Sequence, residues 1–273
     1  MSQIRLSFVL LMLSLMITGC QKRSISNSGY NEYGRNYGYN ATNRELSEFD
    51  VLGVDQKTQY TPQQIQDAFN NKPITHWLIK GDPLLLVQSG AQIPDSQMSA
   101  KLKTYFNVQE FTGVIEEPDH DRRDESETLT VIRLLLEAGK DVPEGFGQTN
   151  PEPKPSYSTS IRMAAAKASI NTIMVYWGII ESGVKNHETK AVSWIPIAGM
   201  ILPDETQYMR IRLKVALIDV KTGQWQMFTP DAFDNESLSA SLNRGSSDQQ
   251  QVEKLKTLAY ANTVNYLLKR YTQ

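Results

Sequence analysis

One long apolar run, at residues 6–17, sets the first limit on the fold. The run has 12 residues, and a helix of that length extends only about 18 Å. The hydrocarbon core of a bilayer is about 30 Å thick, so a permanent transmembrane helix is disfavoured. Arg5 precedes the run and the small residues Thr18 and Gly19 follow it, which is typical of a secretory signal peptide. We predict a leader at residues 1–19. The lack of a second long apolar run excludes a multispan membrane protein.

The leader ends in a short motif that contains the only cysteine of the chain. The sequence Ile17-Thr18-Gly19-Cys20 resembles the lipobox of bacterial lipoproteins. This resemblance implies cleavage before Cys20, diacylation of its sulfur with fatty acids such as palmitate, and acylation of the new N-terminus. Gln21 follows where enterobacterial lipoproteins retained at the inner membrane have aspartate, so the resemblance implies the outer membrane, on its periplasmic face. The alternative is an ordinary signal peptide followed by an incidental cysteine.

The charge balance argues against nucleic acid as a partner. The 273 residues include 28 Lys plus Arg and 30 Asp plus Glu, for a net charge of -2. Domains that bind nucleic acid usually carry a basic excess. A single cysteine can form neither an internal disulfide nor a thiolate metal site. Apolar residues make up 40% of the chain, which is enough for a folded core and excludes a wholly disordered protein.

The segment after the cysteine is polar and poor in aliphatic side chains. Residues 21–45 contain five Asn, four Tyr, three Gly and three Ser, and Ile25 and Ala41 are their only aliphatic residues. Such a composition buries too little apolar area to offset the entropy of ordering. We therefore predict a flexible tether at residues 20–59. The spaced tyrosines are compatible with a recognition element or, as the simpler interpretation, with a low-complexity linker.

From residue 60 onward the pattern changes to helices and strands. Thr61 and Pro62 predict a helix start, and Ile65, Ala68 and Phe69 would form its apolar face. Further helices are expected at residues 96–106, 160–169 and 247–271, and strands at 84–87, 108–114, 172–180, 208–220 and 224–228. This order predicts an α/β (α+β) fold, with a single compact sheet-and-helix sandwich domain at residues 60–273.

Residues 208–220 carry the clearest strand pattern. Alternate residues are apolar on one face, and the opposite face carries Arg210, Arg212 and Lys214. The D-x-x-T-G sequence that follows predicts a hairpin, with Gly223 at the position of positive φ. The last helix is expected to bury one apolar stripe, whose members are Val252, Leu255, Ala259, Tyr260, Val264, Leu267 and Tyr271.

Three segments resemble, in their order, the CsgG family of curli secretion. They are a strand that enters a small-residue turn at 84–91, a small-residue helix that leads into an apolar strand at 163–178, and the strand with the D-x-x-T-G turn at 217–223. The relatives of this family include the penicillin-binding-protein activators and the Pel-polysaccharide export lipoprotein. The resemblance covers residues 80–270. It implies a non-enzymatic envelope protein with a compact α/β domain that binds partners or forms oligomeric rings. The chain departs from the channel-forming members, so the soluble adaptors are the closer relatives.

The sequence contains no recognisable catalytic motif. His76, His120 and His187 lie far apart and form no i, i+4 ligand pair. Ser89 is followed by glycine, but Val87 stands where a nucleophile elbow needs glycine. We predict no cofactor and no metal site. A hydrolase whose site is assembled from distant residues, such as His76 or His187 with a carboxylate and a serine, is the alternative.

Two features suggest binding. The apolar stretch at residues 191–203 includes Trp194, Ile197 and Met200 around a proline and a glycine, which oppose a regular strand or helix. If exposed, it would mark a partner surface; the other interpretation is a segment buried against the sheet.

The second feature is the basic stripe formed by Arg210, Arg212 and Lys214. It could meet an anionic polymer such as peptidoglycan or polysaccharide, or lipid headgroups, or it could be an ordinary solvated face.

These observations lead to one functional hypothesis and two alternatives. The chain is expected to be a lipid-anchored, non-catalytic binding or assembly component of cell-wall or export machinery. Its expected partners are the membrane, through acyl chains on Cys20, and other envelope proteins or a second copy. The alternatives are a lipid-anchored periplasmic hydrolase, acting on peptides or the cell wall, and a subunit of an oligomeric secretion ring.

Overall fold

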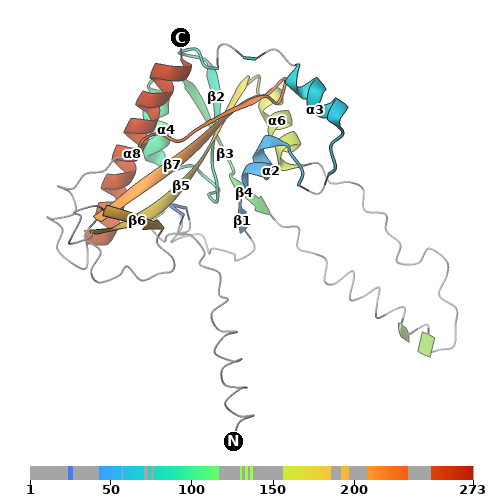
Figure 1. Ribbon diagram of the computed structural model, residues 1–273, viewed down its shortest axis with the longest axis horizontal. Coiled ribbons are helices and arrows are strands. Elements are labelled where there is room, and N and C mark those ends of the chain that lie inside the picture. Colours follow the sequence, from blue (N-terminus) through green and yellow to red (C-terminus); the bar gives the residue numbers. More distant parts are fainter. Residues whose placement is uncertain are drawn as a thin grey trace, which may run out of the picture.

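A mixed β-sheet forms the centre of the computed structural model (Figure 1). The structure describes residues 24–26, 43–56, 58–70, 73–74, 77–116, 130, 133–134, 136–137, 156–185, 192–196, 208–232 and 247–272. Its strands are β1 (Asn43–Glu45), β2 (Pro83–Gln88), β3 (Asn107–Phe111), β4 (Val114–Glu116), β5 (Thr172–Lys185), β6 (Val192–Pro196), β7 (Tyr208–Asp219) and β8 (Trp225–Phe228). Its helices are α2 (Glu48–Leu52), α3 (Pro62–Phe69), α4 (Ser96–Lys103), α6 (Tyr157–Lys167) and α8 (Ser247–Tyr271).

The strand order of the main sheet is β3-β2-β5-β7-β8, and β6 pairs with the second half of β5. The strands β3, β2 and β5 are parallel to one another, whereas β7 and β8 add as an antiparallel hairpin. From β2 the chain reaches β3 on one side and later β5 on the other. The strand order therefore reverses between β2 and β5, which creates a topological switch point at the carboxyl end of β2, beside the middle of β5.

Helices cover both faces of the sheet. Side chains of α4 and α8 pack on one face, with Met98, Leu102 and Tyr260 in the larger buried cluster. Side chains of α6 and α2 pack on the other, with Ile161 and Val51 in the second cluster. Figure 1 shows α8 and α4 on one side of the strands and α6 and α2 on the other. This arrangement confirms the predicted fold class of a sheet-and-helix sandwich.

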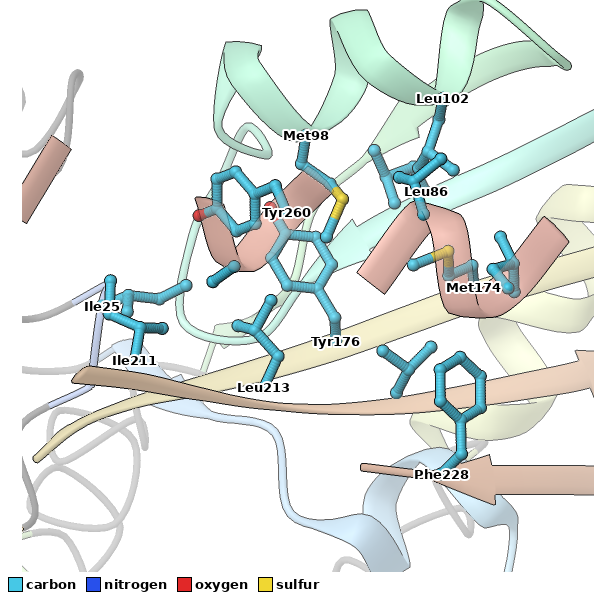
Figure 2. Packing of buried hydrophobic residues seen from close by; sticks show 14 of the residues in the cluster. Ile25, Leu86, Met98, Leu102, Met174, Tyr176, Ile211, Leu213, Phe228 and Tyr260 are labelled. Carbon is cyan, nitrogen blue, oxygen red and sulfur yellow. The ribbon is translucent and has the colours of Figure 1, made fainter. Parts of the chain in front are cut away.

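The larger cluster is closed by two tyrosines that face each other. Tyr176 of β5 and Tyr260 of α8 meet edge to face, with ring centroids 5.9 Å apart, a favourable geometry for aromatic pairs. Figure 2 shows Met98 next to both rings, and Ile25 at the end of the cluster where Ile211 lies.

Several local predictions are confirmed by the structure. Alternate residues of β7 from Ile211 to Leu217 are buried in the larger cluster, and the β7–β8 turn has Gly223 at a φ of 73°. Thr61 caps α3 in a capping box with Gln64. The predicted apolar stripe of the last helix is buried, with Tyr271 partly so.

Other boundaries differ from the predictions for local reasons. The helix predicted at 160–169 begins at Tyr157, because Ser156 accepts a hydrogen bond from the backbone N–H of Thr159 and so caps an earlier start. The apolar stretch at residues 128–138 is ambiguous between strand and helix from its pattern, which favours a strand before a helix. Its described residues, at 130, 133–134 and 136–137, are helical. Residues 192–196 form a regular strand despite Pro196, because that proline stands at the strand end, where a missing N–H is tolerated.

Part of the predicted tether is packed against the domain. Leu46 and Val51 are buried in the second cluster, and α2 is closed by a capping box between Ser47 and Asp50. Ile25 is fully buried in the larger cluster. The ordered body therefore includes residues N-terminal of position 60, because a few apolar side chains in this polar segment find places in the core.

Candidate functional site

The predicted basic stripe lies on the outer face of β7 and is paired within the chain. Arg210 Nε lies 2.6 Å from Glu181 Oε2, and an Arg212 terminal nitrogen lies 3.1 Å from the other oxygen of Glu181. Lys214 Nζ contacts Glu48 of α2. The side chain of Arg210 is 14% exposed and that of Arg212 is 46% exposed. An anionic ligand would therefore compete with Glu181 and Glu48 for these side chains.

The predicted apolar stretch is described only in part. Trp194 lies in β6, where it is the register partner of Gly183 on β5. Ile197, Met200 and Cys20 lie outside the described residues, as do the three histidines. The sheet therefore places Trp194 on a strand along one edge of β5, opposite Gly183, whereas Arg210 lies on β7 along the other edge, opposite Glu181.

A buried polar network, which the sequence pattern did not predict, links the helices on the Tyr176 side of the sheet. Lys256 of α8 is 1% exposed, and its Nζ lies 2.9 Å from Asp95 Oδ2. The hydroxyl of Tyr260 donates to the same oxygen at 2.5 Å. Asp95 stands at the N-cap of α4, yet its side chain makes no capping hydrogen bond. The carboxylate therefore binds side chains of α8 instead of capping α4, and it links the two helices.

The network continues through Gln88 toward the N-terminal segment. The Tyr176 hydroxyl and the Asp95 backbone N–H both donate to Gln88 Oε1, at 2.5 and 2.7 Å. Gln88 Nε2 donates to Ser26 Oγ at 2.9 Å, and Ser26 Oγ donates to the carbonyl of Ser89 at 2.7 Å. Six polar side chains from five parts of the chain are thus joined at the carboxyl end of β2.

Burial determines what this network can do chemically. It raises the pKa of both Tyr176 and Tyr260 well above the usual range, and the nearby charge of Asp95 adds to the effect. Both hydroxyls therefore stay protonated and act as hydrogen-bond donors at neutral pH. Lys256, Gln88 and Asp95 are also buried, so the network is suited to fixing the packing of α4 and α8 rather than to contacting a substrate.

Glu45 is a half-buried carboxylate beside the same end of the sheet. Burial raises its pKa above the usual range, and a hydrogen bond with Ser24 offsets part of that effect. Its Oε1 atom has no hydrogen-bond partner among the described groups. The folded state thus holds a charge at neutral pH that the unfolded chain solvates better.

We predict a pH-dependent effect of Glu45→Gln. Because the pKa of Glu45 is higher in the folded state, this state binds more protons between the two pKa values. The free energy of unfolding therefore falls as pH rises through that window. The Gln variant should be more stable than the wild type at pH 7, and the difference should shrink as pH falls through that window and stay constant below about pH 4.3. Urea unfolding at several pH values measures this, with Asp67→Asn as control. A pH-independent difference would contradict the prediction.

The helix α3 presents an unburied apolar face formed by Ile65, Ala68 and Phe69. The first and last of these are 62% and 84% exposed, and the helix buries none of its residues. The i, i+4 spacing of Ile65 and Phe69 places both on one side of the helix. The sequence pattern had identified this face correctly as apolar, but the structure leaves it exposed.

Comparison with known proteins shows the family. Residues 47–270 match the family described as YafT bacterial lipoprotein. The chain belongs to the YafT family of bacterial lipoproteins. No curated protein and no solved structure matches the chain. The matched range of this YafT lipoprotein contains α3, the main sheet and the polar network apart from Ser26, because residues 24–26 precede it.

The described part of this YafT lipoprotein contains no helix long and apolar enough to cross a bilayer. Within the same residues, no three His, Cys, Asp or Glu side chains gather as metal ligands do.

One sequence feature could have revealed the network. Lys256 falls on the apolar stripe of α8, four residues after Val252 and four before Tyr260. A charged residue at this spacing faces the core and requires a partner. Its partner, Asp95, lies in another helix and could not be identified from local spacing.

Proposed function

We propose that this YafT lipoprotein is a lipid-anchored, non-catalytic component of the cell envelope that binds another envelope protein through the α3 face. Cys20, which follows the lipobox-like motif, carries the acyl chains, and Gln21 directs the protein to the outer membrane at its periplasmic face. Membership of a bacterial lipoprotein family supports the anchor. Confinement at a membrane raises the effective concentration of a binding domain, so a small contact surface suffices.

The unburied face of α3 is the observation that carries this proposal. An isolated helix of eight residues is marginal in water, even with favourable residues. The capping box of Thr61 and Gln64 supports one end of α3, but the helix gains no burial from the described core. A helix that exposes Ile65 and Phe69 gains stability when a partner covers them.

The charge of α3 indicates the kind of partner. Asp67 is the only charged residue in Pro62–Phe69, and the polar side chains of the helix are glutamines. Helices that bind anionic membranes usually carry Lys and Arg on the polar face. The α3 face is better suited to an apolar groove on a protein, which accepts side chains at i and i+4.

Kinship with CsgG-like domains is part of this proposal. The β7–β8 hairpin with its D-x-x-T-G turn supports it, as does the α6–β5 unit that precedes the hairpin. Non-enzymatic adaptors of that family act by binding partners, which agrees with an exposed helix face.

The double change Ile65→Ser with Phe69→Ser tests the α3 face. Both side chains are exposed, so we expect the free energy of unfolding to change by less than about 0.5 kcal/mol for each change. Binding to the partner should be lost. The measurement is in-cell photo-crosslinking from position 66, with the protein expressed at its native level.

The matched control is Met163→Ser, an exposed apolar residue on α6. A heterologous crosslinked product that persists in this control and disappears in the double variant supports the α3 face. A product that is unchanged in the double variant overturns it. A crosslink to a second copy of the chain would overturn the heterologous partner and favour the ring alternative.

A further inference from the structure

The short segment at residues 24–26 is docked into the domain, close in sequence to the proposed lipid anchor. Ile25 is fully buried in the larger cluster. The space for it exists because Gly178 of β5 has no side chain. A Cβ at that position would lie 2.6 Å from Ile25 Cδ1 and 2.9 Å from Leu213 Cδ2. The missing side chain of Gly178 therefore leaves a hollow that the side chain of Ile25 fills.

Hydrogen bonds fix the segment on both sides of Ile25. The Ile25 N–H donates to the carbonyl of Gly178 at 3.0 Å, and Ser24 forms an antiparallel bridge with Ile179. Ser26 Oγ donates to the carbonyl of Ser89, and it accepts from the buried side chain of Gln88. The three residues thus use both backbone and side-chain bonds, as a bound peptide does.

The location of the segment is the topological switch point of the sheet. The carboxyl end of β2 lies there beside the middle of β5, and the two crossover helices, α4 after β2 and α6 before β5, cover opposite faces of the sheet. Open α/β sheets usually bind their ligands in this crevice. Here the chain's own segment occupies it, with Gln88 and Ser89 as the polar groups that face the occupant.

We propose that residues 24–26 act as a strap, a docked segment that holds one end of the sheet, where β2 ends, close to the lipid surface. This inference rests on the proposed acylation of Cys20. Ser24 is the fourth residue after Cys20, and four residue steps of chain extend at most about 14 Å. A lipid anchor joined to a docked strap restricts both the height and the orientation of the domain.

The strap also determines which surface faces away from the membrane. Figure 1 shows α3 near the C-terminal end of the chain, at the opposite end of the sheet from β6. The strap binds at Ile179, close to the β5 residues that pair with β6. A domain held by this end presents the α3 face toward the periplasm, where a protein partner can reach it.

Hydrogen exchange tests the docking directly. The full-length lipidated protein is placed in vesicles of phosphatidylethanolamine and phosphatidylglycerol, and exchange of the Ile25 and Ser26 amides is followed by mass spectrometry. The wild type should protect both amides. Ile25→Ser should speed their exchange at least tenfold, whereas Ile25→Val should keep most of the protection. Gly178→Ala fills the hollow from the other side and should also speed exchange.

Orientation is tested with a spin label at Gln66→Cys on exposed α3. Acylation consumes the thiol of Cys20, so the new cysteine is labelled alone. The distance from this label to spin-labelled lipid headgroups should be long and narrowly distributed in the wild-type background, and broad when Ile25→Ser is added. Equal distributions in the two backgrounds would overturn the orienting role.

Two further outcomes separate the strap from the proposed function. Unprotected amides at Ile25 and Ser26 in the wild type would overturn the strap, whatever the state of the anchor. Protected amides in a protein whose Cys20 is not acylated would support the docking and contradict the lipid attachment. The unfolding transition of Ile25→Ser is also measured. If it stays cooperative, the faster exchange of the two amides reflects local release of the segment and not unfolding of the domain.

Discussion

Replacing Lys256 with methionine should lower the free energy of unfolding by about 3–5 kcal/mol. Lys256 is 1% exposed, and its Nζ lies 2.9 Å from Asp95 Oδ2. Methionine has a similar length but no charge, so the buried carboxylate of Asp95 would lose the positive charge beside it. Among the described side chains it would keep the hydrogen bond from the Tyr260 hydroxyl. The other oxygen, Oδ1, already lacks a hydrogen-bond partner among the described groups. Urea unfolding followed by circular dichroism measures the loss.

Two variants make this prediction specific to the ion pair. Lys254→Met changes an exposed lysine on the same helix and should cost less than about 0.5 kcal/mol. Adding Asp95→Asn to Lys256→Met removes the unpaired charge and should recover more than about 1 kcal/mol, because the two residues are in contact. A loss below about 1 kcal/mol for Lys256→Met would show that the pair is not the main link between α4 and α8.

The second large effect is expected for Cys20→Ser. If Cys20 carries the acyl chains, serine removes the site of attachment, and the protein should leave the membrane fraction. Each buried methylene contributes about 0.8 kcal/mol, so two or more chains give stable attachment that no weak protein contact replaces. Cell fractionation with fatty-acid labelling measures the change. A Cys20→Ser protein that stays membrane-bound and labelled would contradict the account.

Gln21→Asp serves as the matched control for this change. It keeps the thiol and therefore the acylation, but it places the residue that retains enterobacterial lipoproteins at the inner membrane. We expect a labelled, membrane-bound protein whose location shifts from the outer to the inner membrane. Comparison of the two variants separates loss of the anchor from altered sorting.

Patterns with a strong local period were predictable from the sequence. The alternation along β7 has a period of two over twelve residues, and burial of one face follows directly from it. The last helix was predictable for the same reason, because its stripe repeats over 25 residues. The β7–β8 turn followed from the conformational freedom of Gly223, which adopts a positive φ.

Long-range partners were not predictable from local pattern. Composition correctly describes residues 21–45 as polar on average, but it cannot show that one side chain, Ile25, meets Gly178 across the fold. Similarly, the spacing on α8 places Lys256 toward the core, whereas Asp95 comes from a distant helix. For α3, the period identified the apolar face but not whether anything covers it.

Intact-mass measurement of the protein purified from its native membrane tests the central claim most directly. The account predicts a mature chain that begins at Cys20 and carries three acyl groups, two through the sulfur and one on the new N-terminus. An N-terminal fragment with an unmodified Cys20, or a chain that still carries residues 1–19, would contradict it.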